Sequence, residues 1–107
     1  MAVAVCLRSD LPEGATKQVF YEEKPVGLFH IKGTIYAVGN ICTHAYAELH
    51  DGYVDTDDCT VDCPLHGARF DLKTGHYLPL PATANLARYM VTTDATHIYL
   101  TPDSAAP

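Results

Sequence analysis

Short stretches in which apolar and polar residues alternate run along most of the chain. No stretch keeps the 3.6-residue apolar repeat of an amphipathic helix. Strands are therefore expected in residues 2–8 (AVAVCLR), in two or three segments of residues 15–38, in the β-branched stretch 59–62 (CTVD), within residues 67–78, and as a pair within residues 86–102.

Turn residues separate these stretches. The run GLFHI, then Lys32-Gly33, then TIYAV predicts a hairpin with Gly33 supplying the turn conformation. Lys73-Thr74-Gly75 and Asp94-Ala95 predict two further turns. Many short strands punctuated by Gly, Pro and Asp indicate an all-β fold, an antiparallel β-sandwich or barrel.

Two stretches do not follow the strand pattern: NICTHAYAELHD at residues 40–51 and CPLHGA at residues 63–68. Both carry cysteine and histidine. Loops projected from a rigid sheet are frequent positions for functional residues. We therefore expect a site where these two loops meet.

The ligand pattern is Cys42-x-His44, then eighteen residues, then Cys63-x-x-His66. Sulfur and nitrogen ligands suit zinc or an iron–sulfur cluster far better than calcium or magnesium. One zinc ion would take all four as a closed tetrahedral site, whereas a [2Fe–2S] cluster would take two cysteines on one iron and two histidines on the other. The mixed Cys/His pairs favour the cluster, and from spacing alone both interpretations stay open.

Composition and charge narrow the class of protein. With 107 residues, 48% hydrophobic and 19% charged, the chain predicts one globular domain. Its net charge of −6 and lack of a basic run argue against nucleic acid and against an anionic membrane surface, and favour a partner with a basic patch. The N-terminus has no basic flank of the secretory type, so a cytoplasmic location with reduced thiols is expected.

The two loop motifs, CTH and CPLHG, together resemble the Rieske motif. GTIYAVGNICTH, DGYV and CPLHGARFDLKTG are similar to the small Rieske ferredoxins of bacterial multicomponent aromatic-ring dioxygenases. The resemblance covers residues 9–100 and is densest from residue 35 to residue 75.

The resemblance implies a single Rieske domain over residues 1–107, an antiparallel β-sandwich with a small cluster-binding subdomain. The cluster-binding loops would lie at about 40–51 and 62–71. A proline loop at about 78–83, with Pro81, would cover the cluster, and residues 102–107 would form a flexible tail.

The resemblance also implies the function. The chain would be an electron carrier and not an enzyme, with a [2Fe–2S] cluster on Cys42, His44, Cys63 and His66. It would pass single electrons from an NAD(P)H-dependent flavin reductase to the terminal oxygenase of an aromatic-ring dioxygenase system. The chain has no Gly-rich dinucleotide fingerprint, so another protein would handle the nicotinamide.

Three alternatives remain open. The chain could be the small Rieske subunit of an assimilatory nitrite reductase, which shares the fold. It could be a zinc-binding interaction module, or the Rieske domain of an enzyme on its own, although no catalytic-iron triad is visible in the sequence.

Four positions differ from the Rieske relatives in cytochrome complexes: Ala47 and Leu65 imply that no loop disulfide forms, and Ala68 and Phe70 bear on the reduction potential. Rieske relatives in cytochrome complexes carry two bridging cysteines where this chain has Ala47 and Leu65, and a serine and a tyrosine where it has Ala68 and Phe70. A hydroxyl that donates to sulfur stabilises the reduced state, so its absence lowers the potential. The resemblance therefore implies a potential near the low end of the Rieske range, about −150 mV.

The other residues of similar chemistry are expected outside the ligand set. Cys6 and Cys59 lie in apolar patterns and are expected to fill the core. Asp55, Asp57 and Asp58 are expected to form a solvated loop, with a docking surface for a basic partner as the alternative. The remaining histidines are at positions 30, 50, 76 and 97.

Overall fold

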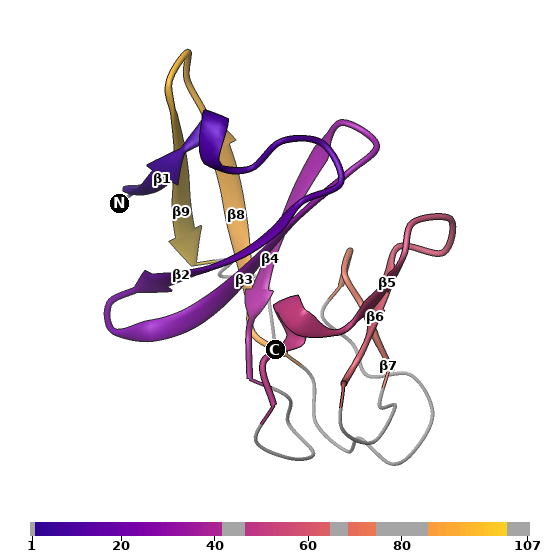
Figure 1. The fold of residues 1–107 in the computed structure, drawn as a ribbon. Helices are drawn as coiled ribbons and strands as arrows, with labels where there is room; N and C mark the ends of the chain where they lie inside the picture. Colours follow the sequence, from indigo (N-terminus) through magenta and orange to yellow (C-terminus); the bar gives the residue numbers. More distant parts are fainter. Residues whose placement is uncertain (1, 42–46, 65–68, 75–85, 103–107) are drawn as a thin grey trace.

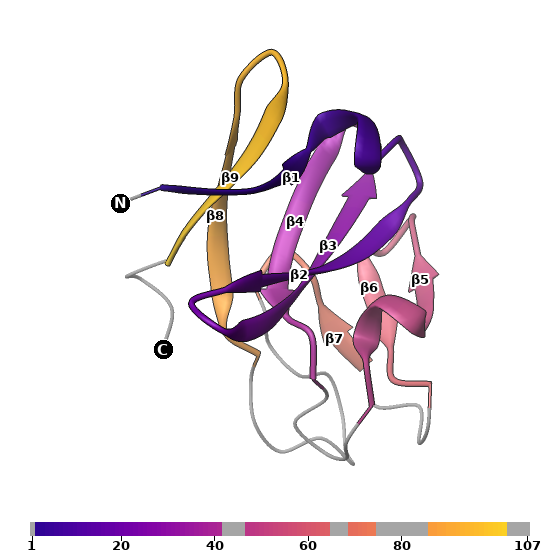
Figure 2. The same ribbon diagram turned by 60° about the vertical axis from the view of Figure 1, so that its left-hand side comes forward.

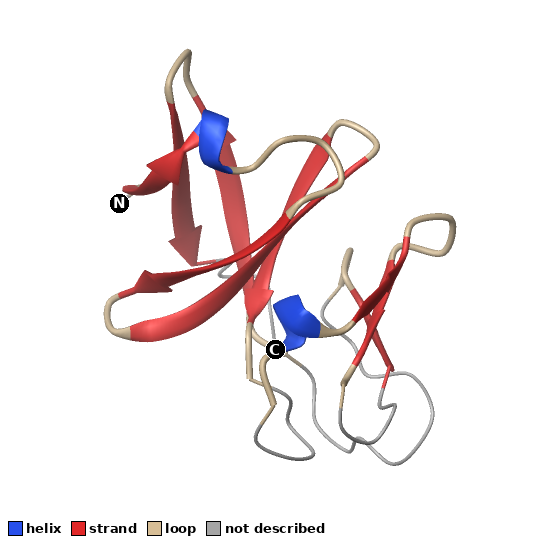
Figure 3. Cartoon of the chain, viewed as in Figure 1, coloured by secondary structure: helices blue, strands red, loops and turns tan. Residues whose placement is uncertain are grey.

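The computed structural model describes residues 2–41, 47–64, 69–74 and 86–102 (Figure 1). Almost all of the regular structure in them is β-sheet (Figure 3). The elements are β1 (Val3–Leu7), η1 (Arg8–Asp10), β2 (Thr16–Tyr21), β3 (Lys24–Ile31), β4 (Thr34–Gly39), η2 (Leu49–Asp51), β5 (Tyr53–Asp55), β6 (Thr60–Asp62), β7 (Arg69–Asp71), β8 (Arg88–Thr93) and β9 (His97–Pro102), where η marks a 3-10 turn.

The strands form two antiparallel sheets. The large sheet has the order β1-β9-β8-β4-β3-β2, and its end strands β1 and β2 contact each other, so the sheet curls into a near-barrel (Figures 1 and 2). The small sheet has the order β5-β6-β7 and packs beside β3 and β4. The predicted antiparallel sandwich with a small subdomain is confirmed.

Tight turns set the register of the first three strands. Lys32 and Gly33 have φ angles of 49° and 82° between β3 and β4, which pair Ile31 with Thr34. Glu22 and Glu23 have φ angles of 49° and 69° between β2 and β3. Two successive left-handed residues match the twist of the flanking strands, so the hairpin predicted at Lys32-Gly33 is confirmed.

Strand β3 is buried on both faces, which explains its nearly continuous apolar run. Val26 and Leu28 point into a core cluster enclosed by the curled large sheet. Phe29 and Ile31 point the other way, into a second cluster shared with the small sheet. Since successive strand residues alternate between faces, one strand joins the two cores.

Most expected strands are found, including the first strand, the stretch after Cys59 and the closing hairpin with its turn at residues 94–96. Strand β5 and both 3-10 turns were not predicted. The strand expected after the turn at Lys73, the proline loop with Pro81, and residues 103–107 of the tail lie outside the described residues. Among the described residues, no helix is long and apolar enough to span a membrane.

Candidate functional site

Of the four predicted ligands, Cys63 lies within the described residues, whereas Cys42, His44 and His66 lie outside them. Cys63 directly follows β6 and is 3% exposed. Its thiol is free, and it belongs to the core cluster between the two sheets. A buried thiol without a disulfide, at the start of a loop, suits a metal ligand.

Cys59 has different surroundings from Cys63. It is 4% exposed, precedes β6 with a φ angle of 59°, and shares the core cluster with Val61. Its backbone carbonyl accepts a hydrogen bond from the Leu72 N–H at 2.9 Å. A side-chain hydrogen bond with Cys59 raises the pKa of Tyr36. The core-filling role expected for Cys59 is confirmed.

The two predicted loops have different bases. An antiparallel bridge pairs Ile41 with Glu48, at the two ends of the first loop. Asp62 pairs with Arg69 across β6 and β7, at the two ends of the second. That second pair is also an ion pair, with Arg69 Nε donating to Asp62 Oδ1 at 2.8 Å and Nη2 donating to Oδ2 at 3.3 Å. The second loop therefore begins and ends on the adjacent strands β6 and β7, and the first is closed at its base by an isolated pair of residues.

Residues that border the two loops and the proline segment share one core cluster. Ala47 follows residues 42–46, Cys63 and Phe70 flank residues 65–68, and Leu86 follows residues 75–85, and all four belong to the cluster between the sheets. The Gly39 N–H also donates to the Ala87 carbonyl at 2.8 Å. The fold thus brings three segments that are distant in sequence to one region.

A buried polar pair at the first loop was not predicted. Asn40 is fully buried, and its side-chain Nδ2 lies 2.8 Å from His50 Nδ1. His50, which follows the first loop, is partly buried. The sequence signal was weak, because a single asparagine after a strand usually reads as a turn residue.

His50, Glu48 and Asp51 also bring ligand-type atoms within 4.8 Å of one another. The Nδ1 atom of His50 accepts the hydrogen bond from Asn40, so it is already engaged. The group contains two acidic side chains that reach the surface, a common arrangement without a metal, and we assign no metal to it.

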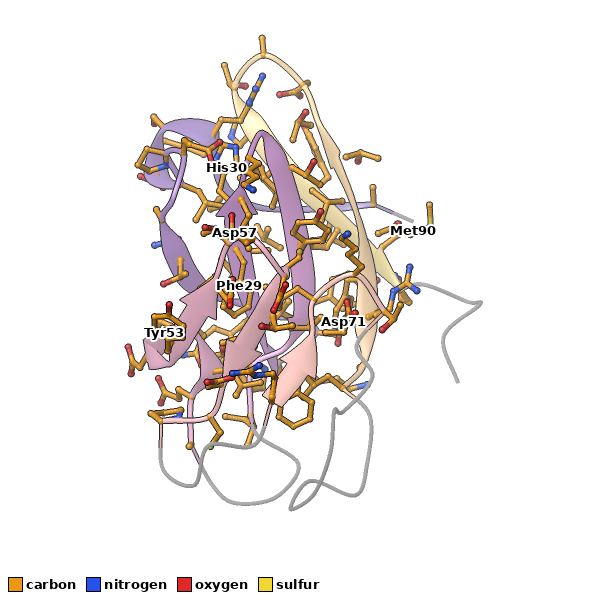
Figure 4. The ribbon with its side chains drawn as sticks, turned by 90° about the vertical axis from the view of Figure 1, so that its right-hand side faces the viewer. Phe29, His30, Tyr53, Asp57, Asp71 and Met90 are labelled. Carbon is orange, nitrogen blue, oxygen red and sulfur yellow. The ribbon has the colours of Figure 1, made fainter. Side chains whose placement is uncertain are left out.

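The acidic loop between β5 and β6 is partly structural. Asp55 Oδ1 accepts hydrogen bonds from the N–H groups of Asp57 and Asp58 at 3.0 and 3.1 Å, which shapes the turn. The Asp57 side chain is 89% exposed and lies 3.2 Å from Lys32 Nζ. In Figure 4, Tyr53 lies on the small sheet and Asp57 at the turn beyond it, while Phe29 lies on a strand of the large sheet. The expected solvated loop is confirmed.

Charge is concentrated around this sheet. Residues 47–74 contain seven acidic and two basic residues, a net charge of −5. The rest of the chain contains six acidic and five basic residues, a net charge of −1. Most of the net charge of −6 therefore belongs to the segment that carries the second predicted loop.

The residues present fit a small iron–sulfur centre. Cys63 offers a buried sulfur within an apolar cluster, and such an apolar shell limits the access of water to a metal-bound thiolate. The sequence supplies one further cysteine and two histidines on two loops, each closed at its base by an antiparallel pair of residues. Ala47 and Phe70, which belong to the same cluster, offer no competing ligand or hydroxyl.

Comparisons with known proteins agree with this arrangement. A family model described as "Rieske [2Fe-2S] domain" matches residues 1–90. The chain is 42% identical over 97 residues, 91% of its length and 90% of the relative's, to the "3-phenylpropionate/cinnamic acid dioxygenase ferredoxin subunit" of Photorhabdus laumondii.

Two solved structures are similar along almost the whole chain. The ferredoxin of carbazole 1,9a-dioxygenase from Nocardioides aromaticivorans has a TM-score of 0.88 and 30% identity, covering 96% of this chain and 99% of that one. A chain of the complex of reduced oxygenase and oxidized ferredoxin in carbazole 1,9a-dioxygenase has a TM-score of 0.81 and 29% identity, covering 92% and 91%.

Proposed function

This chain belongs to the Rieske [2Fe–2S] domain family, and from that premise we propose that it is the ferredoxin component of a bacterial aromatic-ring dioxygenase system. It is an electron-transfer component and not the catalyst, and its cofactor is a Rieske-type [2Fe–2S] cluster. The observation that carries the proposal is the similarity, along nine-tenths of both chains, to a dioxygenase ferredoxin subunit.

The proposed cluster ligands are Cys42, His44, Cys63 and His66. The buried free thiol of Cys63 supports this assignment, as does the antiparallel residue pair at the base of each loop. Bound there, the cluster would accept and release one electron at a time. The chain's own residues would hold it through two thiolates and two neutral imidazoles, and the apolar cluster beside Cys63 would exclude water from the sulfur side.

The proposal extends to the segments that surround the ligands. The cluster-binding loops would lie at about 40–51 and 62–71, with the proline loop at about 78–83 above them, within a single domain of residues 1–107. Phe70 is fully buried and has no hydroxyl to donate to sulfur. It therefore supports a potential near the low end of the Rieske range, about −150 mV.

The proposed partners are an NAD(P)H-dependent flavin reductase, which donates the electron, and a terminal oxygenase, which accepts it. A solved complex of an oxygenase with a ferredoxin similar to this chain supports the second partner. The net charge of −5 on residues 47–74 favours basic docking patches on both. We place the carrier in the cytoplasm, where such a reductase has its nicotinamide substrate.

The test is direct. The protein is purified without added metal, and iron, inorganic sulfide and zinc are measured together with the visible and electron paramagnetic resonance spectra before and after reduction. We expect about two irons and two sulfides per chain and a spectrum that bleaches on reduction. A colourless protein with one zinc would instead support the zinc-binding module.

A second measurement separates the physiological roles. The reduced carrier is mixed with the terminal oxygenase of a phenylpropionate-type dioxygenase, and its reoxidation is followed by stopped-flow absorbance. Transfer that is fast relative to oxidation by air supports the proposal. Transfer only to a nitrite reductase would support the alternative of a small Rieske subunit.

A further inference from the structure

Asn40 is a fully buried amide at the junction between β4 and the first predicted loop. Its side-chain Nδ2 donates to Gln18 Oε1 at 2.8 Å, and its Oδ1 accepts from the His50 N–H at 2.9 Å. Its own N–H donates to the Pro25 carbonyl at 3.1 Å, and its carbonyl accepts from the Leu49 N–H at 2.7 Å. Every polar group of Asn40 is therefore engaged, as a buried amide requires.

His50 completes the arrangement from the other end of the loop. Its Nδ1 accepts from Asn40 Nδ2 at 2.8 Å, which requires the ring proton of the neutral form to sit on Nε2. Its carbonyl accepts from Thr16 Oγ1 at 2.8 Å. The charged groups near the ring are Glu48 and Asp51 of its own turn, at 3.8 and 3.5 Å. The contacts from Thr16 of β2 and from Asn40, which follows β4, are uncharged.

Strand β3 leaves space for the Asn40 amide. A methyl group added at Gly27 would lie 2.5 Å from Asn40 Oδ1 and 3.0 Å from Phe29 Cε1. Gly27 does not have a positive φ, so its lack of a side chain is explained by this close approach and not by backbone conformation. Strands β2 and β3 and the residue that follows β4 thus contribute to one small polar site.

We infer that Asn40 is a positioning residue for the first cluster-binding loop. Asn40 lies just before Ile41, where the chain leaves β4, and it accepts hydrogen bonds from the N–H groups of Leu49 and His50, where the chain returns; the Asn40 side chain itself is fully buried. The second loop has a different base, the half-exposed ion pair of Asp62 and Arg69. The inference rests on the proposed function, because Asn40 would hold the base of the loop that carries the proposed ligands Cys42 and His44.

The main experiment compares two substitutions in the iron-loaded protein. Asn40→Leu keeps the volume and removes the hydrogen bonds. Asn40→Asp keeps an acceptor for the His50 N–H. The second carboxylate oxygen of the aspartate can accept from the Gln18 amide, once that amide rotates, and from a proton on His50 Nδ1. The readouts are the rate of iron release to a chelator, well below the unfolding temperature, and the electron paramagnetic resonance spectrum after reduction.

We expect Asn40→Leu to release iron about tenfold faster or more, since unpaired buried groups at the loop base favour its opening. Its resonance spectrum should shift or broaden. Asn40→Asp should restore both readouts to near those of the wild type. Thr60→Val is the matched control, because it also removes a buried polar atom, one with no hydrogen-bond partner among the described residues. Its iron release should stay within about twofold of the wild type.

A second pair of variants tests the position of the Asn40 side chain without replacing Asn40. Gly27→Ala forces the amide aside, whereas a methyl group at Gly39 meets its nearest atoms, of Ala87, at 3.7 and 3.9 Å. Gly27→Ala should therefore follow Asn40→Leu in both readouts, and Gly39→Ala should match the wild type. His50→Leu removes only the contact of the ring with Asn40, so it should show a milder form of the same effect. It replaces Asn40→Leu in the experiment if that variant does not accumulate as folded protein.

The outcomes are distinct. If Asn40→Leu, Gly27→Ala and His50→Leu lower the melting temperature but leave iron release and the resonance spectrum unchanged, Asn40 has only a structural role and the inference is wrong. Failure of Asn40→Asp to restore the readouts would also count against it. If the wild-type protein contains no iron–sulfur cluster, the proposed function fails first and the inference fails with it.

Discussion

The two sheets of the molecule differ in how they are held together. The strands of the large sheet are five to eight residues long and enclose a core cluster of their own. Each strand of the small sheet has three residues. Its buried side chains, such as Val61 and Phe70, belong to the cluster that it shares with Phe29, Ile31 and Val38 of the large sheet.

This difference indicates that the large sheet is the scaffold of the molecule and that the small sheet, with its loops, carries the site. A sheet of three very short strands has too little apolar surface to be stable alone, so the small sheet depends on the large one and on whatever its loops bind. The small sheet and its loops also carry most of the net negative charge. Substitutions that disturb the packing of the small sheet should therefore affect the cluster and the partners, whereas substitutions in the large sheet away from Asn40 and its contacts should affect folding alone.

The largest expected effect comes from the two buried cysteines next to β6. Cys63→Ser should abolish the visible colour and lower the iron content to below about a tenth of the wild type, because the hard hydroxyl of serine is a poor ligand for this iron site. Cys59→Ser should keep both, because Cys59 fills the core and contacts Tyr36. Iron analysis and visible absorbance check both variants.

Cys59→Ser is also the control for folding. Its cost should be about 1 kcal/mol, from burying a hydroxyl in place of a thiol. If Cys59→Ser lost its iron while Cys63→Ser kept it, the ligand assignment would be wrong.

The next effect concerns a close approach between the loops. A methyl group at Gly52 would overlap the carbonyl oxygen of Asp62, the residue before Cys63. Gly52→Ala should therefore destabilise the protein by about 3 kcal/mol and lower its iron content. Gly33→Ala in the large sheet meets open space but needs a φ angle of 82°, so it should cost only about 1 kcal/mol.

Urea denaturation and iron content measure both glycine variants. A full iron content in Gly52→Ala, together with wild-type stability, would show that the backbones at Gly52 and Asp62 separate easily. Equal iron loss in Gly33→Ala would instead remove the distinction between the two sheets.

Much of the large sheet could be predicted from local pattern. The alternation around Leu28 and the turn at Gly33 are short-range signals, and the structure realises both. Strand β5 was missed because its three residues, Tyr53–Asp55, are too few to show alternation, and it forms only by pairing with β6. Its existence depends on contacts, not on propensity.

The residues of the site also fall into those that a local pattern predicts and those that only the fold brings together. Cys63 could be found because its motif is local, and its burial follows from the strand it terminates. The contact between Asn40 and His50 joins residues ten positions apart and depends on space left by Gly27 of a third segment. No spacing rule covers such a site, so it became visible only when the fold brought the three segments together.

A smaller effect is expected from the charge of the small sheet. Replacing Asp57 and Asp58 by asparagine should slow electron exchange with the flavin reductase about threefold at low ionic strength, and the difference should vanish at about 0.5 M salt. Asp55 is left unchanged because it shapes the turn. Stopped-flow kinetics at several salt concentrations give the measurement.

The matched control changes the same charge on the large sheet. Glu22 and Glu23 are exposed at the turn between β2 and β3, and their replacement by glutamine also removes two negative charges. That variant should keep wild-type kinetics at every salt concentration. Equal slowing in both variants would mean that net charge, and not its position on the small sheet, governs the encounter.

The smallest effect is confined to the large sheet. The hydroxyl of Tyr99 and the N–H groups of Thr96 and His97 donate to the Asp94 carboxylate, which holds the pKa of Asp94 well below its ordinary value. A depressed carboxyl pKa adds stability above the ordinary value of about 3.9, and this stability is lost as the pH falls below it. Asp94→Asn removes the charge but keeps an acceptor for the turn.

Wild type should therefore be slightly more stable than Asp94→Asn at pH 7, and the difference should shrink as the pH falls from about 5 to 3. Urea denaturation followed by circular dichroism measures it at each pH. Because the turn belongs to the large sheet, both proteins should hold the same iron at neutral pH. A lower iron content in Asp94→Asn at pH 7 would mean that the hairpin of β8 and β9 supports the site directly, and the separation of scaffold from site would no longer hold.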